Sequence, residues 1–286
     1  MRPLFASLAF FFLLSHVSSA QSTVTRNSSY QFSLDLTKVH DDMLTVELTP
    51  PLLNKDTLIY KMPAIVPGTY HRYDFGKYIH QFNAFDKSGK NLPVTHTDKN
   101  SWEITGAKYL YRITYDVEDT WDAAIVDKDF VFEPAGTNIQ ADTNFVINNF
   151  GFFGYFDRMR MAPYVVSITH KKGFYGSTAL SDVKRNENTD TYQVANYIDL
   201  ADGPIMYNVP DTAHLFIGGA DILISVYSPT HKNPAKFIAD SLRSLLDAQR
   251  QYLGGTLPVK NYAFLFYLTN NPTGYKSHAE GALEHC

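Results

Sequence analysis

Histidine is the residue type in this sequence with the clearest capacity for chemistry, because neutral imidazole is a common zinc ligand. The 286-residue chain contains ten histidines. His71 and His80 are nine residues apart, and His278 and His285 are seven apart. Neither pair belongs to a His-Glu-x-x-His motif, and the single cysteine, Cys286, excludes a paired-cysteine site. Solvated or locally hydrogen-bonded histidines explain both pairs better than metal ligation does, so we expect no metal bound by this chain.

Serine and cysteine nucleophiles lack the surroundings that catalysis requires. The sequence has no Gly-x-Ser-x-Gly segment, and Cys286 has only His285 beside it to orient its thiol. The glycine pairs Gly218-Gly219 and Gly254-Gly255 lack the further glycines and the lysine of a phosphate-binding loop. We interpret both glycine pairs as turns.

Strand-like segments must position any site, because they dominate residues 29–226. Short runs of Tyr, Phe, Val, Ile and Thr alternate with polar residues and are separated by Gly, Pro, Asn and Asp. Pro67-Gly68 favours a type II turn, in which glycine supplies a positive φ. The pattern predicts a mainly β fold with an antiparallel β-rich N-terminal domain. The predicted strands are 30–36, 43–48, 57–62, 109–115, 164–168 and 222–227.

One amphipathic helix is predicted after Pro229. Asn233 is a suitable N-cap, Pro234 suits the first helical position, and Gly254-Gly255 ends the pattern. The apolar run at residues 262–268 has the length of a strand buried on both faces. A helix followed by such a strand is typical of the start of an α/β domain. The helix residues expected on one apolar face are Phe237, Ile238, Leu242, Leu245, Leu246 and Leu253.

Composition and charge exclude several classes of protein. Hydrophobic residues make up 44% of the chain and charged residues 19%, which is enough to build a core and excludes a disordered chain. The net charge is −4, and no basic cluster exceeds two residues, so nucleic acid is not an expected partner. Aromatic residues make up 14%, which favours strands.

The first 20 residues have the features of an export signal. Arg2 is followed by an apolar run from Leu4 to Leu14 and by small residues before Gln21. The run is too short for a spanning helix, and no later segment is long and apolar enough to cross a bilayer. We therefore expect an exported protein, periplasmic or extracellular, without a membrane anchor after signal cleavage. The lone Cys286 leaves no internal disulfide possible.

These observations predict three parts of the chain. Residues 1–20 are the signal peptide, residues 21–230 the β-rich domain, and residues 231–286 the start of an α/β domain. About 55 residues are too few to close the core of an α/β domain. We therefore expect the second domain to be incomplete.

Several segments together resemble the glycyl aminopeptidase family of zinc metallopeptidases, which is peptidase family sixty-one of the thermolysin-like clan. The resemblance extends in order over nearly the whole mature chain. Each segment alone is a weak signal, but their order and spacing carry the resemblance. The segments are Met62-Pro63, Pro67-Gly68-Thr69-Tyr70, Asp74-Phe75, Ala201-Asp202-Gly203-Pro204-Ile205 and Gly281-Ala282-Leu283-Glu284-His285.

The resemblance implies a β domain followed by a thermolysin-like catalytic domain, in which zinc is held by a His-Glu-x-x-His helix and a later Glu, often with a PDZ domain after it. It also implies that residues 281–285 form an edge strand along the cleft. Such a strand can hydrogen-bond an extended peptide substrate, and Glu284 at its end can bind the α-amine. Gly281 and Ala282 let the backbone approach that substrate closely.

The sequence departs from the family because it contains no His-Glu-x-x-His. The chain is therefore expected to be the N-terminal part of an aminopeptidase that removes small N-terminal residues, truncated before the zinc-binding helix and inactive alone. Zinc is expected to be bound by the complete, longer protein and not by this chain. One alternative is a stand-alone secreted β module that binds glycans or proteins through exposed aromatic residues. A fragment that is itself an active peptidase is the least favoured reading, and Glu284 as a solvated terminal carboxylate stays open.

Overall fold

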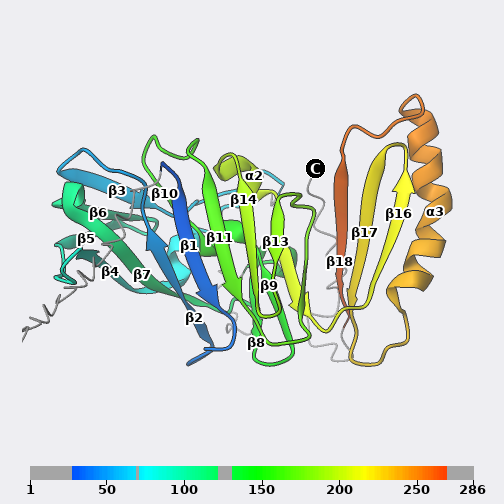
Figure 1. The fold of residues 1–286 in the computed structure, drawn as a ribbon, viewed down its shortest axis with the longest axis horizontal. Coiled ribbons are helices and arrows are strands. Elements are labelled where there is room, and N and C mark those ends of the chain that lie inside the picture. The colour runs from blue at the N-terminus through cyan, green and yellow to red at the C-terminus, as the bar shows by residue number, and fades with distance from the viewer. Residues whose placement is uncertain (1–27, 69–70, 122–130, 269–286) are drawn as a thin grey trace, which may run out of the picture.

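The computed structural model describes residues 28–68, 71–121 and 131–268 (Figure 1). The predicted substrate residues Gly281, Ala282 and Glu284 lie outside these ranges, as do the expected signal peptide and Thr69-Tyr70. The described chain is mainly β, as the sequence predicts, and its strands form four sheets. Within these ranges, no helix has both the length and the apolar character needed to cross a membrane.

The largest sheet forms because strict alternation gives each strand one buried face. In β1, for example, Tyr30, Phe32 and Leu34 are buried and the residues between them are not. Most neighbours are antiparallel, but β1 and β11 are parallel, with Tyr30 paired to Tyr164 and the two rings stacked at 4.4 Å. In spatial order the strands are β13 (Val183–Arg185), β14 (Thr189–Val194), β11 (Tyr164–Thr169), β1 (Tyr30–Asp35), β2 (Met43–Thr49), β7 (Leu110–Glu118) and β4 (Ile79–Asp86).

Two four-stranded sheets complete the β-rich part. The first comprises β10 (Tyr155–Phe156), β3 (Thr57–Lys61), β6 (Ser101–Thr105) and β5 (Val94–Asp98). The second comprises β12 (Tyr175–Ser177), β15 (Ile205–Asn208), β9 (Asn144–Ile147) and β8 (Asn138–Gln140). Short helices connect the strands: α1 (Asn149–Phe152), α2 (Tyr197–Ala201) and 3-10 turns at Phe75–Tyr78, Ala107–Tyr109 and Glu133–Ala135.

Buried tyrosines satisfy the backbone where α1 leads into β10. The Tyr115 hydroxyl donates to the Phe152 carbonyl at 2.6 Å and lies 3.1 Å from the Tyr60 hydroxyl. The Tyr60 hydroxyl accepts the Gly154 N–H at 2.9 Å. Burial raises the pKa of Tyr115, which keeps its hydroxyl protonated and able to donate. Much of the aromatic content therefore belongs to the core.

A three-stranded sheet with one long helix forms the remaining part, at the right of Figure 1. Its strands are β16 (Thr212–Ile217), β17 (Ala220–Tyr227) and β18 (Asn261–Tyr267), and β17 and β18 are parallel. Residues 212–227 fall before the boundary predicted at residue 230, yet they share this sheet with β18. The connection from β17 through the helix α3 (Ala235–Tyr252) to β18 is the helix-then-strand unit that the sequence predicts.

Helix α3 differs from the prediction at its start and on one face. It begins at Ala235, with Pro234 rather than Asn233 at the N-cap position, and Asp211 accepts the Ala235 N–H at 3.1 Å. Of the residues predicted to share the apolar face, Phe237 and Leu245 are 59% and 54% exposed, whereas Leu246 is buried. The reason is that α3 packs mainly over β16 and β17, so within the described ranges part of its apolar surface is not buried.

Strand β18 is covered on one face and half-covered on the other. Ala263 and Leu265 are buried in one cluster with Val146 and Met206 of the β-rich sheets. The alternate residues point to the side of α3 and are only partly buried; they are Tyr262, Phe264 and Phe266. The sequence predicts that this strand is buried on both faces; in the structure one face is buried and the other is only partly buried.

Candidate functional site

The carboxyl ends of β17 and β18 meet the β-rich sheets at a junction centred on Tyr267. Its ring packs edge-on against Trp121 at 4.8 Å and 85°, and stacks on Tyr227 at 4.9 Å. Its hydroxyl donates to Oε1 of Gln140 at 3.2 Å. Binding sites of sheets with parallel strands lie outside the carboxyl ends of those strands, so this junction is a candidate site by its position.

Trp121 is held rigidly at this junction. Its backbone N–H donates to Oδ1 of Asp119 at 2.6 Å, and its indole Nε1–H donates to the Glu133 carbonyl at 2.8 Å. A Cβ on Gly136 would lie 2.5 Å from Oγ1 of Thr120, so only glycine allows the turn after Glu133 to approach so closely. The ring that supports β18 is thus fixed by two segments of the β-rich part.

The loop that carries the Pro67-Gly68 turn is built around Asp74. Gly68 has φ 88°, as the predicted turn requires. Nδ2 of Asn100 donates to Oδ1 of Asp74 at 2.7 Å, and an Arg72 guanidinium nitrogen lies 2.9 Å from the same oxygen. Burial opposes ionisation, but the Asn100 hydrogen bond and the charge of Arg72 together lower the pKa of Asp74. The loop therefore holds an ionised carboxylate at its base.

Tyr73 connects this loop to the turn beside Trp121. The Tyr73 side chain is buried, and this burial raises its pKa, an effect that the nearby Phe132 backbone partly offsets. The neighbouring ring of Phe75 contacts Phe150 at 5.0 Å. A continuous path of contacts thus runs from the Pro67-Gly68 loop through residues 132–133 and Trp121 to the end of β18.

Two buried oxygens at the same turn have no hydrogen-bond donor among the residues that the structure describes. Glu133 is 7% exposed, and no described residue donates to its Oε2. Nδ2 of Asn148 donates to the carbonyls of Pro134 and Gly136, while its Oδ1 is left without a partner. Buried acceptors of this kind normally bind a water or another N–H or O–H donor.

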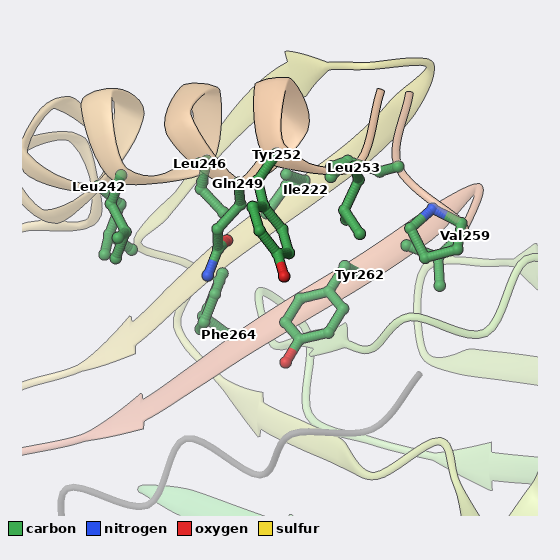
Figure 2. A pocket seen from close by; sticks show the side chains of 12 residues that line it. Ile222, Leu242, Leu246, Gln249, Tyr252, Leu253, Val259, Tyr262 and Phe264 are labelled. Carbon is green, nitrogen blue, oxygen red and sulfur yellow. The ribbon is translucent and has the colours of Figure 1, made fainter. Parts of the chain in front are cut away.

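An apolar groove lies between α3 and β18 (Figure 2). It encloses about 430 Å³. Figure 2 shows Leu246 and Gln249 of the helix extending toward Phe264 and Tyr262 of the strand. The other lining residues are Ile222, Leu242, Leu245, Tyr252, Leu253, Leu257, Pro258 and Val259.

His71 and His80, which are nine residues apart in the sequence, contact different side chains. The His71 ring contacts Tyr73 edge-on at 4.9 Å, whereas Nε2 of His80 lies 2.8 Å from Oε2 of Glu118. In the three described ranges, no three His, Cys, Asp or Glu side chains come together in a way that could hold a metal ion. His278 and His285, and the substrate residues Gly281, Ala282 and Glu284, belong to the part of the chain that the structure does not describe.

Sequence reasoning missed Trp121, Glu133 and the groove. A signal for the buried turn was available in Asn148 and Asn149, two adjacent amides inside an otherwise apolar run at residues 145–156. Both are fully buried, and Asn149 donates to the carbonyls of Leu200 and Gly203. Polar residues in such a run indicate side chains that bind loop carbonyls.

Comparison with known proteins gives one family match and several similar structures. Residues 31–209 match the model of the Peptidase M61 N-terminal domain. An aminopeptidase N family protein from Idiomarina loihiensis has a similar structure, with TM-score 0.70, 19% identity, and coverage of 86% of this chain and 40% of its own. The chain thus spans less than half the length of that protein. No curated protein matches.

Two further structures are more distant. An M1 zinc metallopeptidase from Deinococcus radiodurans has TM-score 0.41 and 12% identity, covering 84% of this chain and 56% of its own. Legionella pneumophila aminopeptidase A has TM-score 0.44 and 11% identity, covering 86% of this chain and 30% of its own.

Proposed function

We propose that this chain is the N-terminal part of a zinc-dependent aminopeptidase of the glycyl aminopeptidase kind. The reason is that the chain belongs to the family of the Peptidase M61 N-terminal domain. Its β-rich part then packs against the start of the catalytic domain, whose sheet contains β16, β17 and β18 and carries α3 on one face. The family match is the observation that carries this proposal.

The uncovered groove supports the idea of an incomplete catalytic domain. A sheet that joins an α/β layer buries both of its faces, whereas β18 leaves Tyr262 and Phe264 partly exposed on the side of α3. A chain truncated before the rest of its domain leaves such a surface.

Substrate contacts are proposed for the segment beyond β18. Glu284 would bind the free α-amine of a peptide, and Gly281 and Ala282 would let the peptide backbone approach. Small N-terminal residues would be preferred. In this proposal the protein is exported by residues 1–20 and acts in the periplasm or outside the cell.

Zinc is part of the proposed complete enzyme, but the residues present do not fit it. The described ranges offer no set of three possible ligands, and the whole sequence contains no His-Glu-x-x-His. We therefore assign no catalytic step to this chain and expect it to be inactive alone.

The alternative of a stand-alone binding module receives no support from the aromatic residues. Its binding surface would need exposed rings, whereas half of the aromatic side chains in the described ranges are buried in the core. Among the described residues, the exposed rings come from separate elements and loops, apart from Phe237 and Tyr252 at opposite ends of α3; the others are Tyr109, Phe132 and Phe216.

The proposal is tested by extending the reading frame past Cys286 and assaying the longer product. We expect zinc-dependent release of Gly or Ala from short peptides, and no release from the same peptides when they are N-acetylated. Glu284→Gln should reduce this activity at least 100-fold, while the neighbouring Glu280→Gln should not. A frame that stops without a His-Glu-x-x-His in the following few dozen codons would refute the truncation.

A further inference from the structure

We propose that His170 and Asp190 are a pH-sensitive ion pair, which forms when the imidazole is protonated and tightens the seam between two sheets of the β-rich part. The two sheets are the largest sheet and the sheet that contains β12 and β15. The ion pair lies in the β-rich part alone and is independent of the peptidase activity proposed above.

His170 lies where the chain leaves one sheet for the other. It follows β11 of the largest sheet, and the turn after it leads into β12. Its backbone N–H donates to the Asn188 carbonyl at 2.9 Å, and its ring lies 5.2 Å from the ring of Tyr207 in β15. Its side chain is only 3% exposed, so protein groups rather than water must balance a charge on this ring.

The contacts of His170 indicate which ring nitrogen carries the proton in the neutral form. Nδ1 lies 3.0 Å from the Lys171 carbonyl oxygen, which can only accept, so the proton is on Nδ1 and Nε2 holds a lone pair. Nε2 has no hydrogen-bond partner in the described part of the chain. It lies 3.7 Å from Oδ1 of Asp190, whose side chain is also 3% exposed. In the neutral form, two acceptor atoms thus lie beside each other without a proton between them.

Asp190 has one oxygen to spare for this contact. Its Oδ2 accepts hydrogen bonds from Arg185, Tyr192 and Tyr207. Burial raises the pKa of Tyr192 and of Tyr207, so both hydroxyls stay protonated and able to donate. None of the three donates to Oδ1, which is the oxygen nearer to His170.

The cations around this carboxylate have other partners as well. Arg185 of β13 also donates to the Gly176 carbonyl at 2.7 Å, and its guanidinium lies over the ring of Tyr175 in β12 at 4.2 Å. It therefore holds Asp190 from the side of Oδ2 and leaves the side of Oδ1 to His170.

The two lysines that follow His170 extend to the surface. Lys171 pairs with Asp142 at 3.0 Å, and Lys172 pairs with Glu187 at 2.5 Å. All four side chains are more than half exposed, so water screens their charges. Asp190 is therefore the buried anion that can balance a protonated His170.

Protonation supplies the donor that the neutral ring lacks. The imidazolium has an N–H on both nitrogens, so the contact with Lys171 stays and Nε2–H can donate to Oδ1 of Asp190. Charge-assisted bonds of this kind are about 2.7–2.9 Å long, so Nε2 would approach the carboxylate by roughly 1 Å. The Lys171 carbonyl also accepts the Phe174 N–H at 3.1 Å, which couples the ring to the turn that enters β12. Acid therefore draws this turn toward β14.

Thermal unfolding of the 286-residue chain at about pH 8 and about pH 5 tests the proposal, since histidine changes charge in this range. In His170→Asn the amide can replace Nδ1, and nothing replaces Nε2. The melting temperature of the unaltered protein relative to this variant should rise by several degrees toward pH 5. The gain is present where His170 is protonated and is lost as pH rises. A difference that stays constant, or that falls toward pH 5, would overturn the proposal.

His80→Asn is the matched control. Nε2 of His80 lies 2.8 Å from Oε2 of Glu118, but these side chains are 42% and 39% exposed, so the pair should contribute little. An equal pH dependence for the two variants would assign the effect to surface charge and refute the buried pair. In His170→Gln the amide nitrogen can stand near the place of Nε2 and donate at every pH, so this variant should lose the pH dependence too.

Hydrogen exchange of the unaltered protein gives a local measurement that needs no variant. After correction for the intrinsic effect of pH, the amides of residues 171–177 should show about fivefold greater protection at pH 5 than at pH 8. The amides of β16, in another sheet, are the internal reference and should not change. Equal protection of residues 171–177 at the two pH values would show that His170 does not close onto Asp190.

Discussion

The Tyr207 hydroxyl donates a hydrogen bond to Oδ2 of Asp190 at 2.9 Å and thereby joins two sheets of the β-rich part. Asp190 lies in β14 and Tyr207 in β15. The same carboxylate oxygen accepts from Arg185 at 2.6 Å and from Tyr192 at 3.3 Å, and the Asp190 side chain is only 3% exposed. This buried network closes the seam between the sheets.

Replacing Asp190 with alanine should destabilise the protein by about 1–3 kcal/mol, because the buried Tyr207 hydroxyl would lose its acceptor, while Arg185, whose side chain is 30% exposed, keeps the Gly176 carbonyl. Urea unfolding followed by circular dichroism measures the loss. Asp142→Ala is the matched control, since Asp142 pairs with Lys171 on the surface and is 78% exposed; its effect should stay within about 1 kcal/mol. Similar losses for the two variants would show that the Asp190 network contributes little. If Asp190→Ala does not fold, Tyr207→Phe should still cost about 1–3 kcal/mol.

Asp74 should make stability depend on acidic pH. Its pKa is lowered from the ordinary value of 3.8 in the folded protein, so its contribution is full above that value and is lost as pH falls through the lower folded pKa. Asp74→Asn should therefore destabilise the protein at pH 6 by about 1–2 kcal/mol, and the difference from the unaltered protein should shrink by pH 3.

Thermal unfolding of both proteins between pH 3 and pH 6 checks this dependence. Asp35 and Asp86, whose pKa values are also lowered, contribute equally to both proteins and cancel in the difference. A difference that stays constant over the whole range would contradict the assigned role of Asp74.

Trp121→Ala should weaken the junction at the end of β18. Removing a packed tryptophan costs about 3–5 kcal/mol and deprives Tyr267 of its edge-on contact. Limited proteolysis should then cut near residues 209–211 faster than in the unaltered protein. Phe216→Ala is the control, because Phe216 is 76% exposed on β16. Unchanged cleavage and stability in Trp121→Ala would show that other contacts hold the junction.

Gly76→Ala should disturb the loop around Asp74 through steric overlap. An added Cβ would lie 2.3 Å from the Lys99 carbonyl oxygen, so the backbone must shift, at a cost of about 1–3 kcal/mol or more. Gly89→Ala meets no atom within 4 Å and changes only a turn residue with φ 83°, which costs about 1 kcal/mol. Denaturant unfolding of the two variants should rank them in this order, and the reverse order would contradict the close packing at Gly76.

Local patterns in the sequence predicted the elements well and their partners poorly. The alternation at residues 30–36 and the helical spacing after Pro234 correspond to β1 and α3, because both depend on neighbouring residues. The N-cap prediction failed because Asp211, more than twenty residues earlier, accepts the first helical N–H. The exposure of Leu245 was missed because periodicity shows that a face is apolar without showing what covers it.

The sequence by itself determined that the chain is rich in strands, that one helix and one apolar strand follow, and which family motifs it carries. Only the tertiary structure decided that β1 pairs in parallel with β11, that β16 and β17 join β18, and that Trp121 supports Tyr267. These pairings join residues more than a hundred positions apart in two of the three cases. Such contacts form because the whole chain buries its apolar faces together, and no local pattern specifies which distant face a strand will meet.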